Sequence, residues 1–384
     1  MKKINNIIEK NIVLIITIFF IVQPLIDVIT YFNLNYLNNN FTFGMILRFI
    51  FMAFALYYLI FINKDKKKIL IYLGLLTIYG LLFFIPYLNT NLLFLELKSF
   101  LKVYYFIIML IFFYMNKDKL KEINYKYFSY IFFIYILFIL IPNLIGNFSS
   151  YDVAKIGEKG LFNSANEIGA ILSFLFPIYI YRMFEDKNKL KYIPAIILYI
   201  CTIFIIGTKV PVLAFIITVL VFGIRYFINT IKKKQIKQSI IITSSLIILT
   251  IFSIIIIPKT PFYSNIKTHM NYFHINSVKD IFANYDNLNN IIFSERLTLS
   301  EDNFNYYKAQ STYKQIFGAG FYQIKSNNIL ERKTAEIDYV DIFVSYGILG
   351  TLLFFIPIIY ILTNFIISLK EAKNKVLNLT IYFL

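Results

Sequence analysis

The chain has 384 residues, 59% of them hydrophobic, and a mean hydropathy of +0.67. This excludes a soluble domain, because the apolar residues gather in runs of about 20, the length that crosses a bilayer as a helix. The formal net charge of +17 would suit nucleic-acid binding, but its distribution indicates membrane topology instead, so we expect no nucleic-acid partner. The single cysteine, Cys201, excludes an intrachain disulfide.

Apolar runs recur along the chain, and each must be helical in lipid, where only a helix pairs its own backbone groups. The first run is too long for a signal-peptide core and has no small-residue cleavage site after it, so we expect a permanent anchor. An eleventh run begins at Val376 and stops at Leu384, so we expect a truncated C-terminus. Ten full transmembrane helices are predicted at 12–32, 44–62, 69–88, 97–115, 127–145, 166–181, 192–206, 210–228, 239–257 and 342–366.

Lysine and arginine are distributed unevenly between the connections. The N-terminus and every second connection together hold 23 of them, whereas the alternate short connections hold 3. The positive-inside rule therefore places the N-terminus in the cytoplasm. The long polar loop at about 259–340, between the ninth and tenth helices, is then extracytoplasmic. We predict an all-α polytopic membrane protein, one integral domain over 1–384, with short helices in this loop, for example around Asn303 to Ile316.

Several predicted helices contain ionisable residues, which are costly in a membrane and tend to mark function. With the predicted topology they all fall in the outer halves. One interpretation is snorkelling near helix ends, with a structural pair between Asp27 and Arg48. The other is an outward-facing polar site, in which cations suit a phosphate or pyrophosphate and carboxylates suit proton transfer. The residues are Asp27, Arg48, Lys98, Lys102 and Lys209.

Three carboxylates, Glu336, Asp338 and Asp341, lie where the long loop enters the last full helix. They are candidates for proton transfer at the outer surface. The alternative is that acidic side chains satisfy free N–H groups and the dipole at the start of the helix, and Asp341 fits such a cap best. His269 and His274 do not predict a metal site, since cysteines are absent nearby and carboxylates are scattered.

Several short segments follow one another along the chain: Gln23-Pro24-Leu25-Ile26-Asp27, Gly160 to Asn166, Gly207-Thr208-Lys209, Arg296, Gly318-Ala319-Gly320, and Tyr339 with Gly347 and Gly350. In this order they resemble the O-antigen ligase/polymerase family of polytopic membrane glycosyltransferases. In many members the last block begins His-Asn, and counting back from Gly350 places Glu336 at the position of that histidine. The turn with Lys209 stands where the family has a Ser-Arg turn.

The resemblance implies roles for individual residues. Glu336 would be the general base for an acceptor sugar hydroxyl, with Asp338 and Asp341 as alternatives. Cations would bind the diphosphate of the donor, namely Arg296, Lys209, Arg48 and Lys102. Structural or secondary positions would be Asp27, Asn163, Asn166, Gly318 and Gly320. The resemblance also implies inversion at the anomeric carbon, with no metal and no cofactor.

The predicted function is a polymerase of surface polysaccharide (capsule, exopolysaccharide or O-antigen-like) in the bacterial cytoplasmic membrane. It would transfer a glycan from a polyprenyl-diphosphate donor to an acceptor hydroxyl at the outer leaflet. Ligase-type transfer of the finished glycan to a lipid or wall acceptor remains open, since no residue reports the acceptor. A flippase is disfavoured because such transporters carry mid-membrane sites and internal repeats, and a non-catalytic accessory protein is the third alternative. Expected partners are the lipid-linked oligosaccharide donor, the glycan acceptor, membrane lipids, a chain-length regulator and a flippase.

Overall fold

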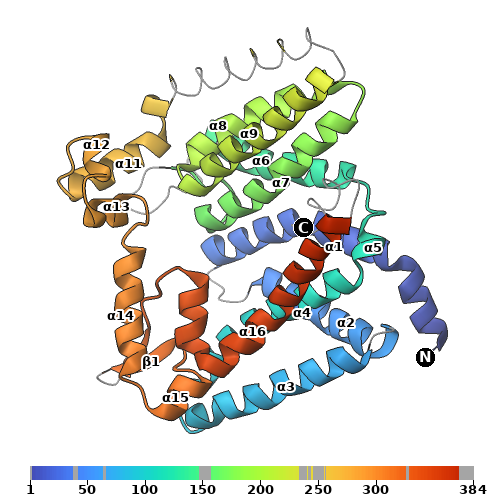
Figure 1. Ribbon diagram of the computed structural model, residues 1–384, viewed down its shortest axis with the longest axis vertical. Coiled ribbons are helices and arrows are strands. Elements are labelled where there is room, and N and C mark those ends of the chain that lie inside the picture. Colours follow the sequence, from blue (N-terminus) through green and yellow to red (C-terminus); the bar gives the residue numbers. More distant parts are fainter. Residues whose placement is uncertain are drawn as a thin grey trace. The chain divides into compact units, whose positions relative to one another are not determined.

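The computed structural model describes residues 2–37, 42–63, 66–146, 157–232, 257–325 and 328–371, with three single positions at Ile240, Ser244 and Ile255. Within these residues, nine helices are long and apolar enough to cross a membrane (Figure 1). The protein is therefore an all-α polytopic membrane protein, as predicted. The predicted helix at 239–257, apart from those single positions, and the run from Val376 lie outside the described residues.

The chain forms two compact units. The first comprises Met1–Ile12, Ile46–Glu122 and Ile275–Phe383, and the second comprises Val13–Met45 and Ile123–His274. The organisation as one integral domain stays a prediction.

The first unit contains the start of α1, most of α2, and the helices that enclose the end of the long loop. α2 continues into the wider turn of the π-helix η1, and α3 continues into the tighter turn of the 3-10 helix η2. The elements are α1 (Lys2–Tyr36), α2 (Phe43–Tyr57), η1 (Tyr58–Ile62), α3 (Lys66–Phe84), η2 (Ile85–Tyr87), α4 (Leu93–Met115), α5 (Lys117–Leu120), α12 (Val278–Ile281), α13 (Tyr285–Ile291), α14 (Arg296–Lys308), α15 (Thr312–Phe317), β1 (Tyr322–Lys325), β2 (Asn328–Glu331) and α16 (Asp338–Glu371).

The second unit contains the rest of α1 and a helical bundle in which α7 packs on α6 and α9. Its core is aromatic, with Phe132, Phe176 and Tyr199 fully buried and the last two rings stacked at 4.3 Å between centroids. The elements are α6 (Lys126–Ile145), α7 (Ala165–Glu185), η3 (Lys189–Tyr192), α8 (Ile193–Ile206), α9 (Lys209–Lys232), η4 (Ile257–Lys259) and α11 (Pro261–Tyr272).

Local sequence sets several helix ends. Ser164 caps α7 by accepting a hydrogen bond from the Glu167 amide at 3.3 Å, as Ser does at many helix starts. Gly207 ends α8 in the left-handed conformation, with φ 74°, which glycine adopts without a steric penalty. Thr260 caps α11, and Pro261 occupies its first position, where the missing N–H has no intrahelical partner to lose.

The long loop contains short helices, as predicted. α14 and α15 together cover most of the predicted helical region but are separated by a turn around Gln310. The loop also contains an antiparallel hairpin that was not predicted, in which Tyr322 of β1 faces Glu331 of β2. In Figure 1, α14 and α15 lie beside α16, in agreement with the contacts between these elements.

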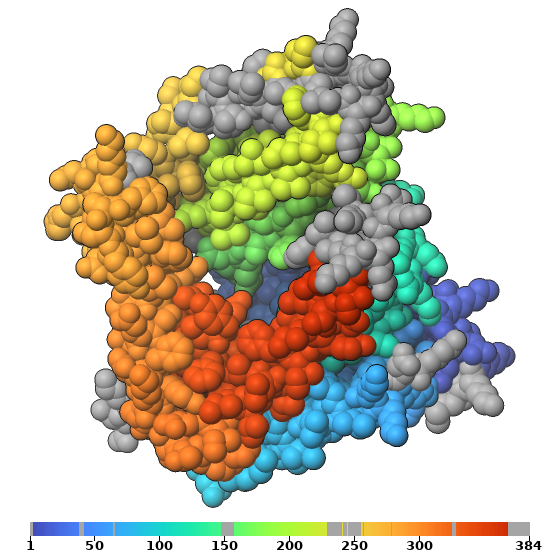
Figure 2. Space-filling view, viewed as in Figure 1, coloured from blue at the N-terminus to red at the C-terminus, as the bar shows by residue number. Residues whose placement is uncertain are grey.

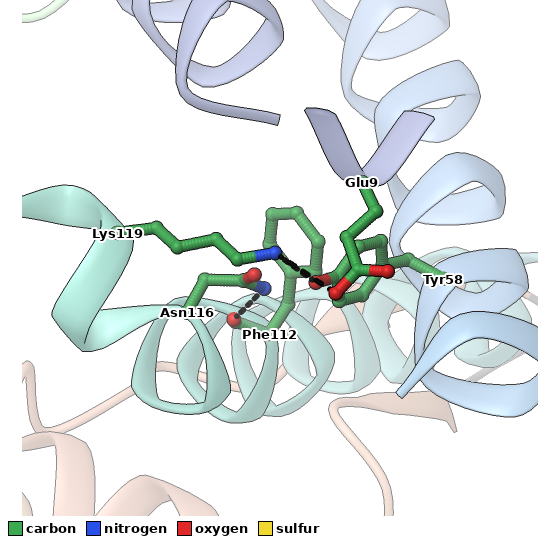
Figure 3. Close-up of polar contacts among 5 residues, drawn as sticks. All are labelled: Glu9, Tyr58, Phe112, Asn116 and Lys119. Atoms are coloured by element: carbon green, nitrogen blue, oxygen red, sulfur yellow. Dashed lines mark hydrogen bonds and ion pairs between the residues drawn. The ribbon is translucent and has the colours of Figure 1, made fainter. Parts of the chain in front are cut away.

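A polar cluster lies at the C-terminal end of α4 (Figure 3). Lys119 Nζ is 3.4 Å from Glu9 Oε1 and 3.5 Å from the hydroxyl of Tyr58 in the π-helix. Asn116, the C-cap of α4, donates to Phe112 O at 2.9 Å. Through Lys119 of α5 this cluster ties the start of α1 to the π-helix η1 within the first unit, at the opposite end of α4 from the site described next.

Candidate functional site

The N-terminal part of α16 is interrupted at Gly347, which has φ 66° and ψ −171°. A side chain is strained in this region of backbone space, so the interruption requires glycine. The break frees two carbonyls from the helix. Val344 O accepts from Ala319 N at 3.3 Å, and Ser345 O accepts from Gly320 N at 2.9 Å. The loop thus bonds directly to the backbone of α16.

The predicted Gly318-Ala319-Gly320 motif lies against this interruption. A Cβ at Gly318 would collide with Ser345 O, and one at Gly320 would collide with the carboxylate of Glu96 and the hydroxyl of Tyr87. Both positions therefore need glycine for close approach. In Figure 2 the segments from α14 to α16, coloured orange to red, form one continuous face of the first unit.

A small apolar cluster supports the turn that precedes α16. Ala335 is fully buried and Ile337 packs against the same cluster, so both neighbours of Glu336 face inward. Glu336 itself has φ 54°, and its side chain is 62% exposed. Burial of the two flanking residues therefore directs the intervening carboxylate outward. The other members of the cluster are Leu299, Tyr306, Tyr307, Val340, Phe343 and Val344.

Asp341 lies in the first turn of α16 and is only 8% exposed. Its Oδ1 accepts a hydrogen bond from the Ala335 amide at 2.8 Å, so it shapes the turn that presents Glu336. This contact agrees with the cap-like interpretation of Asp341. Asp338, the first residue of α16, is exposed. Whether either carboxylate takes a proton from substrate stays a prediction.

The structure brings together two residues that the sequence analysis assigned to complementary roles. Arg296 Nη2 lies 2.7 Å from Glu336 Oε2, although the residues are 40 positions apart in the chain. Arg296 is the first residue of α14. The positive end of the helix dipole therefore adds to the charge of the guanidinium.

Buried Asn289 holds the start of α14 in place. Its side-chain oxygen accepts from the Leu297 amide at 3.2 Å, and its amide group donates to Thr298 Oγ1 at 2.9 Å. These bonds fix the residue that carries the guanidinium. A positioned guanidinium beside an exposed carboxylate can bind an anion and accept a proton from a neighbouring hydroxyl.

The sequence analysis missed two buried charges that bind the same loop, Glu96 and Arg332, which are 0% and 6% exposed. Glu96 was assigned to a connection, whereas α4 begins at Leu93 and places it in the first helical turn. Its Oε1 accepts from the Tyr322 amide at 2.7 Å. The available signal was a lone carboxylate inside an apolar stretch, Leu93 to Leu97, where an ionisable residue is costly.

The other predicted cations of the first unit lie on the membrane helices. Arg48 is exposed on α2, and Lys98 and Lys102 are exposed on α4, on a different face from buried Glu96. The binding of a diphosphate by Arg48 and Lys102 together with Arg296 stays a prediction.

Three predicted residues of the second unit have defined surroundings. Asp27 Oδ2 accepts from the Tyr135 hydroxyl at 3.0 Å. Asn163 Oδ1 accepts from Asn35 Nδ2 at 3.3 Å, so both residues have a structural partner. Lys209 is half-buried at the first position of α9.

Two further positions complete this unit. Asn166 is exposed on the first turn of α7. The turn before Lys209 is held by Asn265, whose side chain donates to Gly207 O at 3.2 Å. The predicted roles of Lys209 and Asn166 toward substrate remain predictions.

Fold and site together define a polytopic membrane protein with a cation–carboxylate pair where a long polar loop meets a transmembrane helix. The family described as O-antigen ligase like membrane protein matches residues 9–281 and 279–384. The chain therefore belongs to this family, whose members are membrane enzymes of surface glycan assembly. No curated protein and no solved structure matched the chain.

Proposed function

We propose that this protein is a glycosyltransferase that polymerises a surface polysaccharide at the outer leaflet of a bacterial cytoplasmic membrane. It would transfer a glycan from a polyprenyl-diphosphate donor to the hydroxyl of an acceptor sugar. The observation that carries this proposal is the 2.7 Å contact between Arg296 and Glu336. Membership of the family supports glycosyl transfer in general.

The ion pair suggests an order of events. The Arg296 guanidinium is paired with the Glu336 carboxylate. An arriving diphosphate competes for the guanidinium, because phosphate oxygens form charge-assisted, bidentate hydrogen bonds with arginine. Glu336 is then released beside the place where the donor binds.

The chemical step is a single displacement. Glu336 takes the proton of the acceptor hydroxyl, the acceptor oxygen bonds to the anomeric carbon, and the bond to the diphosphate oxygen breaks. The diphosphate leaves with the bonding electrons, and its charge is neutralised by Arg296 and by the further cations Lys102 and Arg48. A single displacement inverts the anomeric centre. Cations supply the neutralisation, so no divalent metal is required.

The proposed orientation rests on the distribution of basic residues, which favours a cytoplasmic N-terminus and an extracytoplasmic long loop. The donor lipid would approach from the outer leaflet, and the loop would cover two bulky glycans during transfer. A flippase that supplies the donor and a protein that regulates chain length are the partners expected of such an enzyme.

The test is a chromosomal deletion complemented with Glu336→Gln, with Glu301→Gln as the control for an exposed carboxylate of the same loop. Glu336→Gln keeps the shape of the side chain but cannot take a proton, so transfer should fall by roughly 10²–10⁴-fold. Glu301→Gln should support normal polymer. The measurements are membrane content of the protein, polysaccharide on gels, and transfer by isolated membranes in the presence of a chelator.

Lipid extracts from the Glu336→Gln strain distinguish the alternatives. A polymerase defect leaves single repeat units on the polyprenyl diphosphate, whereas a ligase defect leaves long chains on it. Full polymer with Glu336→Gln would remove Glu336 from the role of base. Repeat units confined to the cytoplasmic leaflet would instead indicate a flippase.

A further inference from the structure

Buried Arg332 joins three segments around the candidate site. Its Nη2 donates to Ser345 Oγ of α16 at 2.7 Å, and its Nη1 donates to Gly320 O at 3.2 Å. Its backbone amide donates to Phe321 O at 2.7 Å. One residue therefore fixes the 332–337 segment, which ends in the Glu336 turn, to both the glycine turn and the interrupted helix.

Burying a guanidinium is unfavourable unless opposite charges and acceptors compensate for lost hydration. Here the guanidinium also lies over two aromatic rings, Tyr306 at 5.7 Å and Phe321 at 5.8 Å from the centroids, an arrangement that favours arginine. Burial lowers the pKa of Arg332, and the facing Tyr306, Asp341 and Glu96 oppose that shift. The guanidinium of an arginine nevertheless stays protonated at neutral pH.

The two buried carboxylates, Glu96 and Asp341, bind backbone amides at opposite ends of one loop segment. Glu96 binds the amide of Tyr322 at 2.7 Å, and Asp341 binds the amide of Ala335 at 2.8 Å. Arg332 lies between these two points in the sequence and bonds to both the loop and α16. Glu336 directly follows the second point, so its position depends on all three buried charges.

We propose that Arg332 is a positioning residue for Glu336, with Asp341 and Glu96 as its buried counter-charges. In this view Glu96 touches no substrate. The inference rests on the proposed function only in taking Glu336 as the base, because the position of the Glu336 carboxylate can be measured without glycan transfer.

The experiment measures how fast Glu336 reacts with a water-soluble carbodiimide and glycine ethyl ester in purified full-length protein, by peptide mass spectrometry. Exposed Glu301 in the same sample is the internal reference. In Arg332→Gln, Glu336 should react faster by roughly threefold or more relative to Glu301, because its carboxylate spends less time against Arg296. Arg332→Lys should be intermediate, since an ammonium cannot reach Gly320 O and Ser345 Oγ with a rigid fork.

Two milder variants keep the test valid if Arg332→Gln does not fold. Ser345→Ala removes one acceptor and leaves the guanidinium, and Glu96→Gln keeps an oxygen for the Tyr322 amide but removes the counter-charge. Both should shift the Glu336 rate in the same direction by a smaller factor. The matched control is Lys333→Gln, which makes the same charge change at an exposed neighbour and should leave the rate unchanged.

A Glu336 rate equal to wild type in folded Ser345→Ala and Glu96→Gln, and in Arg332→Gln where it folds, would overturn the inference. A changed rate together with full transfer by Glu336→Gln would leave Arg332 as a positioning residue and reject Glu336 as the base. An unchanged rate together with loss of transfer in Glu336→Gln would support the proposed function and reject the role of Arg332.

Discussion

Arg296 and Glu336 form an ion pair that is open to solvent, with side chains 38% and 62% exposed. Such a pair contributes only about 0–1 kcal/mol to folding, because water screens it and ordering two long side chains costs entropy. Substituting either residue should therefore leave the fold intact. Any effect on glycan transfer then reports on chemistry or binding.

The guanidinium of Arg296 can be tested with a short isoprenyl diphosphate. Farnesyl diphosphate should raise the unfolding temperature of the purified protein, since a ligand that binds only the folded state stabilises it. Arg296→Ala should weaken this binding by roughly tenfold or more, because charge-assisted hydrogen bonds to the phosphates are lost. Thermal shift over a range of ligand concentrations measures the change.

The control for this prediction is Lys308→Ala, which removes an exposed cation from the last turn of the same helix, α14. It should bind farnesyl diphosphate as the wild type does. Equal weakening in both variants would mean that the ligand responds to the net charge of the loop, and unchanged binding in Arg296→Ala would exclude the assigned role.

At the residue scale, the sequence predicted residues that belong to a family pattern, but it did not predict residues whose role depends on contacts between distant segments. Resemblance to the family pointed to Arg296 and Glu336 separately, and the structure shows that they are in contact. Glu96 and Arg332 were missed, because the Glu96 bond to Tyr322 spans 226 positions. Such a pairing has no local signature, since it arises only when the loop packs on the first turn of α4.

The interruption of α16 at Gly347 joins a transmembrane helix to a loop. A Cβ at this position would collide with the carbonyls of Ile316 and Gln315, and a residue other than glycine would be strained by the backbone angles. Gly347→Ala should therefore destabilise the first unit by roughly 1–3 kcal/mol. The measurement is a lower thermal unfolding temperature in detergent, with release of the Gly318–Gly320 turn seen as faster proteolysis of the loop.

Gly74→Ala in α3 is the matched control. An added Cβ there meets nothing within 4 Å among the residues that the structure describes, and alanine is favoured over glycine inside a helix by about 1 kcal/mol. The control should be neutral or slightly stabilising. If Gly347→Ala were equally stable, the interruption would not depend on glycine.

At the element scale, hydropathy predicted the nine described membrane helices, and polar composition predicted a loop with short helices. The hairpin was not predicted, because four-residue strands carry too few alternating positions to stand out. The kink was not predicted either. Gly347 lies in an apolar run that looks continuous, and only its packing against Ile316 and Gln315 requires the break.

At the scale of the whole molecule, the orientation in the membrane is the prediction on which the proposed reaction depends. Single cysteines at Glu301 in the long loop and at Lys121 after α5 test it in a Cys201→Ser background, because both positions are exposed. An impermeant maleimide added to intact cells should label the cysteine at 301 and leave the one at 121 unlabelled until the cells are opened. The reverse pattern would contradict an outward-facing site.

The bonds between the loop and α16 also have a consequence for the surrounding lipid. Beyond the interruption at Gly347, α16 continues over 348–371, about 36 Å at about 1.5 Å per residue, whereas the hydrocarbon core is roughly 30 Å thick. A helix of this length tilts or protrudes to a degree set by the thickness of the bilayer. Because Val344 and Ser345 bond to loop amides, any change of tilt would also move the Glu336 turn. A mismatch between the helix and the bilayer thickness would therefore change the geometry of the site. Reconstitution experiments should use lipids of one defined acyl chain length.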